Sequence, residues 1–159
     1  MRIATLGDVL LDVIVRLEQP LERGDDVRAR TRTLAGGQAA NVAAWAASLG
    51  ADARCIAKRG ADPAGELLAH ELGARGVELV GPVAEGSTGV VVSIVENGER
   101  SMASDRGVAP TLVAEEIDDR WLDGCDVDRY ARTALACDAR REQGGVDDRL
   151  AEQRVAGQM

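Results

Sequence analysis

Aromatic side chains are almost missing from this sequence: phenylalanine is absent, and aromatic residues make up only 2% of the chain. Any hydrophobic core must therefore be built mainly from alanine, valine, leucine and isoleucine, which dominate a hydrophobic fraction of 45%. Charged residues make up 29%, and this balance excludes wholesale disorder. A chain of 159 residues is long enough for one ordinary domain.

Residues that bind metals are also scarce. The single histidine and the three widely spaced cysteines, Cys55, Cys125 and Cys137, contain no CxxC pair, so we expect no metal site. Isolated cysteines in odd number favour free thiols in a reducing compartment. No apolar run reaches membrane-spanning length and no signal peptide is recognisable, so we expect a cytoplasmic protein without a membrane partner.

Positive charge is in deficit, since the net charge is -8. An acidic balance argues against non-specific binding of nucleic acid or anionic membranes. Lys58 is the only lysine, which leaves few options for a lysine-based phosphate clamp. In the basic run Arg28–Arg32, arginines alternate with small residues, as is typical of the solvent-facing side of a strand. The other interpretation of this run is an anion-binding patch.

Hydrophobic periodicity in the first half predicts strands followed by a helix. Apolar runs at 3–6 and 9–17 predict strands, and alternation over 27–34 predicts a half-exposed strand. Spacing over 38–49 predicts a helix that ends before Gly50. The expected apolar stripe of this helix consists of Val42, Trp45, Ala46 and Leu49.

A strand at 54–57 leads to a second helix, for which Asp62 is the expected N-cap and Gly76 the terminator. Asn97-Gly98 between two strand-like runs predicts a hairpin. Pro110 opens a third predicted helix, which ends at Trp121. The expected apolar stripe of the second helix consists of Leu67, Leu68 and Leu72.

This order of elements predicts an α/β fold with a parallel sheet, to which the segment 27–34 and the hairpin add an accessory antiparallel sheet. After residue 126 the apolar residues are mostly alanine, and no strand or apolar stripe continues. We therefore expect one domain over 1–126 and a weakly structured tail over 127–159.

The string GGQAAN, residues 36–41, places two glycines before the first predicted helix. Adjacent glycines indicate unusual dihedral angles or close approach of a ligand to the backbone. The helix N-terminus offers unpaired N–H groups, and Asn41 can donate and accept hydrogen bonds. The pattern fits a small-molecule site, and it also fits a glycine hinge with a capping amide.

Together with Ala43, Gly50 and Gly60, this string resembles the N-terminal signature of the PfkB, or ribokinase-like, family of carbohydrate kinases. GDVLLD, RGADPAGELL and NGERSM…DRGVA resemble further family segments in the same order. The resemblance covers residues 1–126. It implies the N-terminal part of a ribokinase-like α/β/α sandwich with a small β-sheet lid, and lid strands that can pair two subunits as a homodimer.

The resemblance also implies ATP-dependent phosphorylation of a sugar or nucleoside hydroxyl. It assigns substrate hydroxyls to Asp12, and it implies that Gly36, Gly37, Gln38 and Asn41 help to hold the sugar. From its position alone, Asp12 could equally be a solvated charge at a strand end.

Family members carry a GAGD motif with the catalytic base, and the ATP and Mg²⁺ sites, in their second half. This sequence has no GAGD, and its nearest string, Gln143–Asp148, is typical of a polar turn. We therefore expect no catalytic residue and no ATP- or Mg²⁺-binding residue in this chain. The expected cause is a truncated or frameshifted coding sequence. The alternative function is a non-catalytic module that binds sugar or self-associates.

Overall fold

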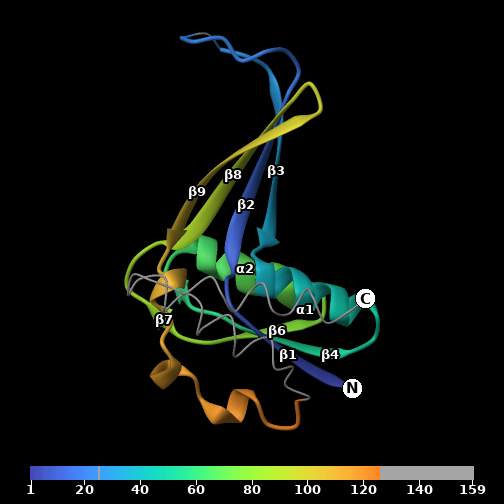
Figure 1. The fold of residues 1–159 in the computed structure, drawn as a ribbon, viewed down its shortest axis with the longest axis vertical. Helices are drawn as coiled ribbons and strands as arrows, with labels where there is room; N and C mark the ends of the chain where they lie inside the picture. Colours follow the sequence, from blue (N-terminus) through green and yellow to red (C-terminus); the bar gives the residue numbers. More distant parts are fainter. Residues whose placement is uncertain (25, 126–159) are drawn as a thin grey trace, which may run out of the picture.

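The computed structural model describes residues 1–24 and 26–125, so the expected tail over 127–159 and Cys137 lie outside the described residues. A body of parallel strands and two helices carries a four-stranded sheet that projects away from it (Figure 1). The predicted α/β fold with an accessory sheet is confirmed.

The body sheet is parallel and has the strand order β1-β4-β6. Helix α1 packs on β1 and β4, and α2 packs on β6. Both helices cover one face of the sheet, because their buried residues share a single core cluster with Ala53, Cys55 and Val77. The elements of the body are β1 (Arg2–Leu6), α1 (Gln38–Ser48), β4 (Asp52–Ile56), β5 (Arg59–Gly60), α2 (Pro63–Ala74), β6 (Val77–Val80) and β7 (Val83–Ala84).

Helix α1 has the predicted position but buries a different face. Its buried residues are Ala39, Ala40 and Ala43. Most of the predicted stripe is wrong: Val42, Trp45 and Leu49 are 52%, 71% and 82% exposed. The alanines face the sheet because small side chains let the helix backbone lie close to Ala53 and Cys55, which are also small.

Helix α2 follows its prediction more closely. Asp62 is the N-cap, and its Oδ1 accepts a hydrogen bond from the Gly65 N–H at 2.8 Å. Gly76 follows the helix with a φ of 78°, as a glycine terminator does. Leu68 and Leu72 are fully buried, whereas Leu67, which was expected in the same stripe, is 38% exposed.

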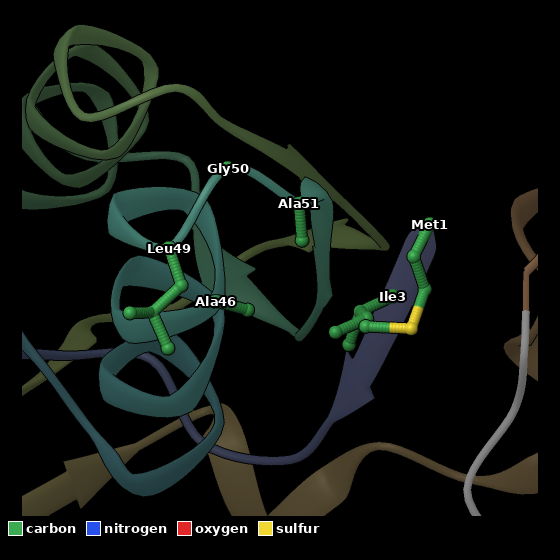
Figure 2. Close-up of a pocket in the computed structure, with 6 residues that line it drawn as sticks. All are labelled: Met1, Ile3, Ala46, Leu49, Gly50 and Ala51. Atoms are coloured by element: carbon green, nitrogen blue, oxygen red, sulfur yellow. The ribbon is translucent and has the colours of Figure 1, made fainter.

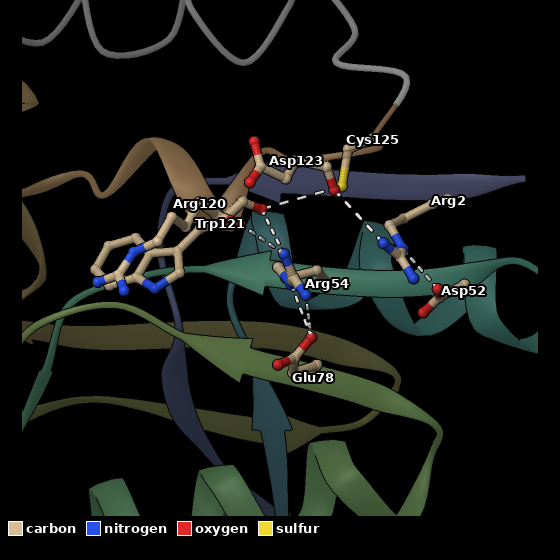
Figure 3. Close-up of polar contacts among 8 residues, drawn as sticks. All are labelled: Arg2, Asp52, Arg54, Glu78, Arg120, Trp121, Asp123 and Cys125. Atoms are coloured by element: carbon tan, nitrogen blue, oxygen red, sulfur yellow. Dashed lines mark hydrogen bonds and ion pairs between the residues drawn. The ribbon is translucent and has the colours of Figure 1, made fainter.

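The opposite face of the body sheet carries ion pairs (Figure 3). Arg54 of β4 pairs with Glu78 of β6 at 2.6 Å, and Arg2 of β1 pairs with Asp52 at 2.7 Å. Arg54 also donates through Nη1 to the backbone carbonyl of Trp121 at 2.8 Å. These contacts attach the segment that follows the projecting sheet to this face.

That segment forms three separate 3₁₀ turns, so the helix predicted over 110–121 is wrong. The turns are η1 (Ala109–Thr111), η2 (Ala114–Glu116) and η3 (Asp119–Trp121). The buried Lys58 holds this conformation: its Nζ donates to the Thr111 carbonyl at 3.2 Å and pairs with Glu116 at 2.6 Å. β-branched Val113 and Ile117 adopt extended backbone between the turns, in keeping with their weak helix propensity.

The projecting sheet, called the lid below, has the strand order β3-β2-β8-β9. Strand β2 pairs antiparallel with β3 and parallel with β8, so the lid contains residues 10–17 as well as the two predicted pieces. Asn97 and Gly98, with φ of 49° and 84°, form the predicted hairpin turn. The strands are β2 (Leu10–Leu17), β3 (Ala29–Gly36), β8 (Thr88–Glu96) and β9 (Glu99–Gly107).

The base of the lid is tied to α2 by Asp62 and Thr88. The two carboxylate oxygens of Asp62 accept hydrogen bonds from the Thr88 N–H at 2.8 Å and from its hydroxyl at 2.5 Å. The hydroxyl oxygen accepts in turn from the Gly60 N–H at 3.0 Å. Desolvation works to raise the pKa of Asp62, but the hydrogen bonds from Thr88 and Gly65 outweigh it and hold the pKa below its ordinary value.

Replacing Asp62 by asparagine is expected to destabilise the chain by about 1–2 kcal/mol at neutral pH, because the amide cannot accept all of these hydrogen bonds. The lowered pKa means that the carboxylate contributes stability above the unfolded pKa of about 4 and loses it as pH falls through the folded value. The gap between wild type and Asp62→Asn in urea unfolding should therefore shrink in acid. Asp119→Asn, at an exposed aspartate, serves as the control and should show no such change.

Candidate functional site

The diglycine turn lies where β3 ends and α1 begins. Gly37 is the N-cap of α1 with a φ of 99°, which favours glycine. A Cβ on Gly37 would collide with the Asp8 carbonyl and the Val9 Cα, so the turn packs directly against the loop that follows β1. A Cβ on Gly36 would overlap the carboxylate of Asp12. Gly37 is therefore required by backbone packing, whereas Gly36 is required for the Asp12 carboxylate to keep this position.

Asp12 is held in the middle of the lid base, on β2 between β3 and β8. It is half-buried, and its carboxylate lies against the backbone of Gly36. Desolvation raises the pKa of Asp12, while the positive charge of Arg100 opposes the rise. A partly desolvated carboxylate accepts hydrogen bonds from neighbouring hydroxyl groups more strongly than a fully hydrated one.

The first turn of α1 presents its polar groups to solvent. Gln38 and Asn41 are exposed, and the Asn41 N–H donates to the Gly37 carbonyl at 2.9 Å. No side chain caps this helix, and its first turn contains no acidic residue. The structure thus brings Asp12 and Gly36 into contact. The other three predicted residues, Gly37, Gln38 and Asn41, lie at the N-cap and in the first turn of α1.

A pair of charged residues that the sequence analysis did not single out borders this site. Arg106 of β9 donates through Nη2 to Asp8 at 2.6 Å. Asp8 follows β1 and precedes the Val9 backbone that packs on Gly37. The break of the first apolar run at Gly7-Asp8 was the only local signal, and nothing in the sequence links it to a residue 98 positions away.

An apolar hollow lies at the other end of α1 (Figure 2). It is poorly suited to binding a polyol, because none of its lining residues has a polar side chain. The lining residues are Met1, Ile3, Ala46, Leu49, Gly50 and Ala51. The candidate site is therefore the N-terminal end of α1.

Other chemistry is limited in the part of the chain that the structure describes. Burial raises the pKa of the Cys55 thiol to about 11, so it is a poor nucleophile. Residues 1–24 and 26–125 contain no cluster of His, Cys, Asp and Glu suited to a metal ion. None of their helices is long and apolar enough to cross a membrane. The string Gln143–Asp148 lies outside the described residues.

Comparison with known proteins gives a consistent result. The family model for "pfkB family carbohydrate kinase" matches residues 1–142, and thus continues past the expected domain end at residue 126. The ATP-dependent ribose-1-phosphate kinase of Halopiger xanaduensis is 36% identical over 129 residues. That alignment covers 79% of this chain and 44% of the relative, so the chain spans less than half of the relative's length.

Solved structures agree in fold. Adenosine kinase from Sinorhizobium meliloti superposes with a TM-score of 0.67 at 26% identity, covering 87% of this chain and 52% of that one. Ribokinase from Arabidopsis thaliana, complexed with ribose and ATP, gives a TM-score of 0.55 at 29% identity, covering 67% and 36%. The family model covers most of the chain. This chain belongs to the pfkB family of carbohydrate kinases.

Proposed function

We propose that the described residues form the sugar-binding part of a cytoplasmic kinase that transfers phosphate from ATP to a hydroxyl of a sugar or nucleoside. One observation carries the proposal: the Asp12 carboxylate is held against the diglycine turn at the open N-terminus of α1. The names of the relatives, which include a ribose-1-phosphate kinase and an adenosine kinase, make pentose compounds the first class to test.

In this proposal each residue of the site makes a different contact with the sugar. Asp12 accepts hydrogen bonds from two neighbouring hydroxyls, which a carboxylate can do with its two oxygens. The glycines let the ring approach the backbone, and Gln38 and Asn41 offer amide groups at its edge. Packing and backbone pairing fix Asp12 before substrate arrives, so little entropy is lost on binding.

The family implies ATP and Mg²⁺ as well. Residues 1–24 and 26–125 contain no cluster of residues suited to a metal ion, and the ammonium group of Lys58 is buried against Glu116. We therefore assign no ATP- or Mg²⁺-binding role and no catalytic role to them. In the proposed enzyme, the base and the nucleotide site come from elsewhere.

The alternative is a binding module that self-associates through the lid. Its support is the lid face opposite Asp12, where half-buried aliphatic side chains lie on a sheet that projects from the body (Figure 1). Such a face, on a sheet whose outer strand β9 is exposed, favours pairing with a second copy. The side chains are Val13, Val15, Val92 and Ile94.

One experiment separates the two functions. The purified chain is incubated with ATP, Mg²⁺ and a panel of pentoses, pentose phosphates and nucleosides, and ADP formation and thermal stability are followed. Sugar-induced stabilisation at a concentration-independent sedimentation coefficient supports the sugar-binding part of a kinase, and sugar-dependent ADP formation would show in addition that this chain supplies the base and the nucleotide site. A concentration-dependent sedimentation coefficient without sugar-induced stabilisation supports the module. The absence of both contradicts the two proposals together.

Asp12→Asn is expected to weaken sugar binding by roughly 10- to 100-fold, because the amide loses charge-assisted hydrogen bonds to the hydroxyls. Binding is measured by titration calorimetry with the sugar that stabilises the wild type best. Glu99→Gln, at the exposed start of β9, removes the same charge away from the site and should leave the affinity unchanged. Equal losses in both variants would show that net charge, and not Asp12, matters.

Gly36→Ala is expected to lower the free energy of unfolding by about 1–3 kcal/mol and to abolish sugar binding, because the new methyl group displaces the Asp12 carboxylate. Gly73→Ala is the matched control. A Cβ there meets no atom within 4 Å, and alanine in a helix should stabilise the chain by up to about 1 kcal/mol. Unfolding in urea measures both changes, and unaltered binding by Gly36→Ala would contradict the site.

A further inference from the structure

The arginines of the lid lie on the face that carries Asp12. Residues paired in the registers of β2 with β3 and β8, and of β8 with β9, point to the same side of the sheet. By this criterion Asp12 shares its face with every arginine of the four strands, whereas Glu96, Glu99 and Asp105 lie on the other face. The arginines are Arg16, Arg30, Arg32, Arg100 and Arg106. An acidic chain thus has a positive surface beside its candidate sugar site.

Two of these arginines belong to the row of the sheet next to Asp12. The next row of the sheet toward the lid tip contains Ile14, Ser93 and Arg32, about 7 Å along the strands from Asp12. Arg100 starts one row farther, but its Nε and Nη2 donate to the Ser93 hydroxyl at 3.1 and 2.7 Å. The Arg100 guanidinium therefore lies in the row of Arg32.

The charges of Arg32 and Arg100 are not neutralised by an ion pair. Within residues 1–24 and 26–125, Arg32 forms no hydrogen bond or ion pair, and the hydrogen-bond partner of Arg100 is a neutral hydroxyl. The positive charge of Arg100 reaches Asp12, where it opposes the desolvation that raises the pKa. Two neighbouring arginines already have acidic partners: Arg106 pairs with Asp8 and Arg30 pairs with Glu18.

We propose that the sugar bound at this site carries a phosphate group, and that Arg32 and Arg100 bind that phosphate. The inference rests on the proposed function and names its substrate class. Only β2 separates β3 from β8, so Arg32 and the Arg100 guanidinium lie on either side of Ile14. The two strands that carry Arg32 and Ser93 are about 10 Å apart. A phosphate with a charge of about -1.5 to -2 fits between two such donors, and Asp12 is then one sugar length away.

The full 159-residue chain is titrated with ribose 1-phosphate, ribose and ATP in separate calorimetric experiments. Ribose 1-phosphate should bind at least about tenfold more tightly than ribose, because two charge-assisted contacts are added. Arg32→Gln and Arg100→Gln should each cost about tenfold in affinity for ribose 1-phosphate, and Arg32→Gln should leave the affinity for ribose unchanged. Within the described residues Arg32→Gln removes no hydrogen bond or ion pair, so we expect the fold to be preserved.

Arg30→Gln is the matched control. Arg30 lies on the same strand and face, one row farther from Asp12, and it is paired with Glu18 at 3.1 Å. Its replacement should leave all affinities unchanged. Equal binding of ribose and ribose 1-phosphate overturns the inference and leaves the proposed function standing. A loss of ATP affinity in Arg32→Gln, with both sugars unaffected, assigns the arginines to the nucleotide and also overturns it. Binding of neither sugar overturns the inference and the proposed function together.

Discussion

The space above the Cα of Gly36 can hold a side chain of residue 36 or the carboxylate of Asp12, but not both. The candidate site depends on this exclusion. The register that pairs Leu10 with Gly36 places Asp12 on the same face, one row away. A slip of one residue between β2 and β3 would turn Asp12 to the opposite face of the lid. The glycine therefore serves to set where the carboxylate lies as much as to form a turn.

The same registers give the lid two different faces. One carries Asp12 and the arginines beside aliphatic residues such as Ile14 and Val91, and the other carries Val13, Val15, Val92 and Ile94 with the acidic residues of β8 and β9. Asp62 joins this sheet to the body. Its carboxylate caps α2 and also accepts a hydrogen bond from Thr88, the first residue of β8. The helix cap and the base of the lid are thus a single polar cluster, so that loss of either contact affects both elements.

Sequence patterns predicted the features that depend only on neighbouring residues. The Asp62 cap, the Gly76 terminator and the Asn97-Gly98 turn were predicted because each depends on residues within a few positions. Predictions failed where distant residues decide. The alanine face of α1 is chosen by the small residues of β4, and Lys58 holds the segment that was expected to be helical. The proposed role of Asp12 rests on family resemblance, since periodicity alone leaves it a strand-end charge.

Lys58 is the only lysine of the chain, and its ammonium group is buried against Glu116. Acylating agents, whether enzymes or reactive metabolites, therefore find no accessible side-chain amine here. All other cationic side chains of the lid and body are arginines or the lone histidine, which do not react in this way. The side-chain charges of this molecule are thus insensitive to acetylation, in contrast to proteins whose anion sites are built from lysine.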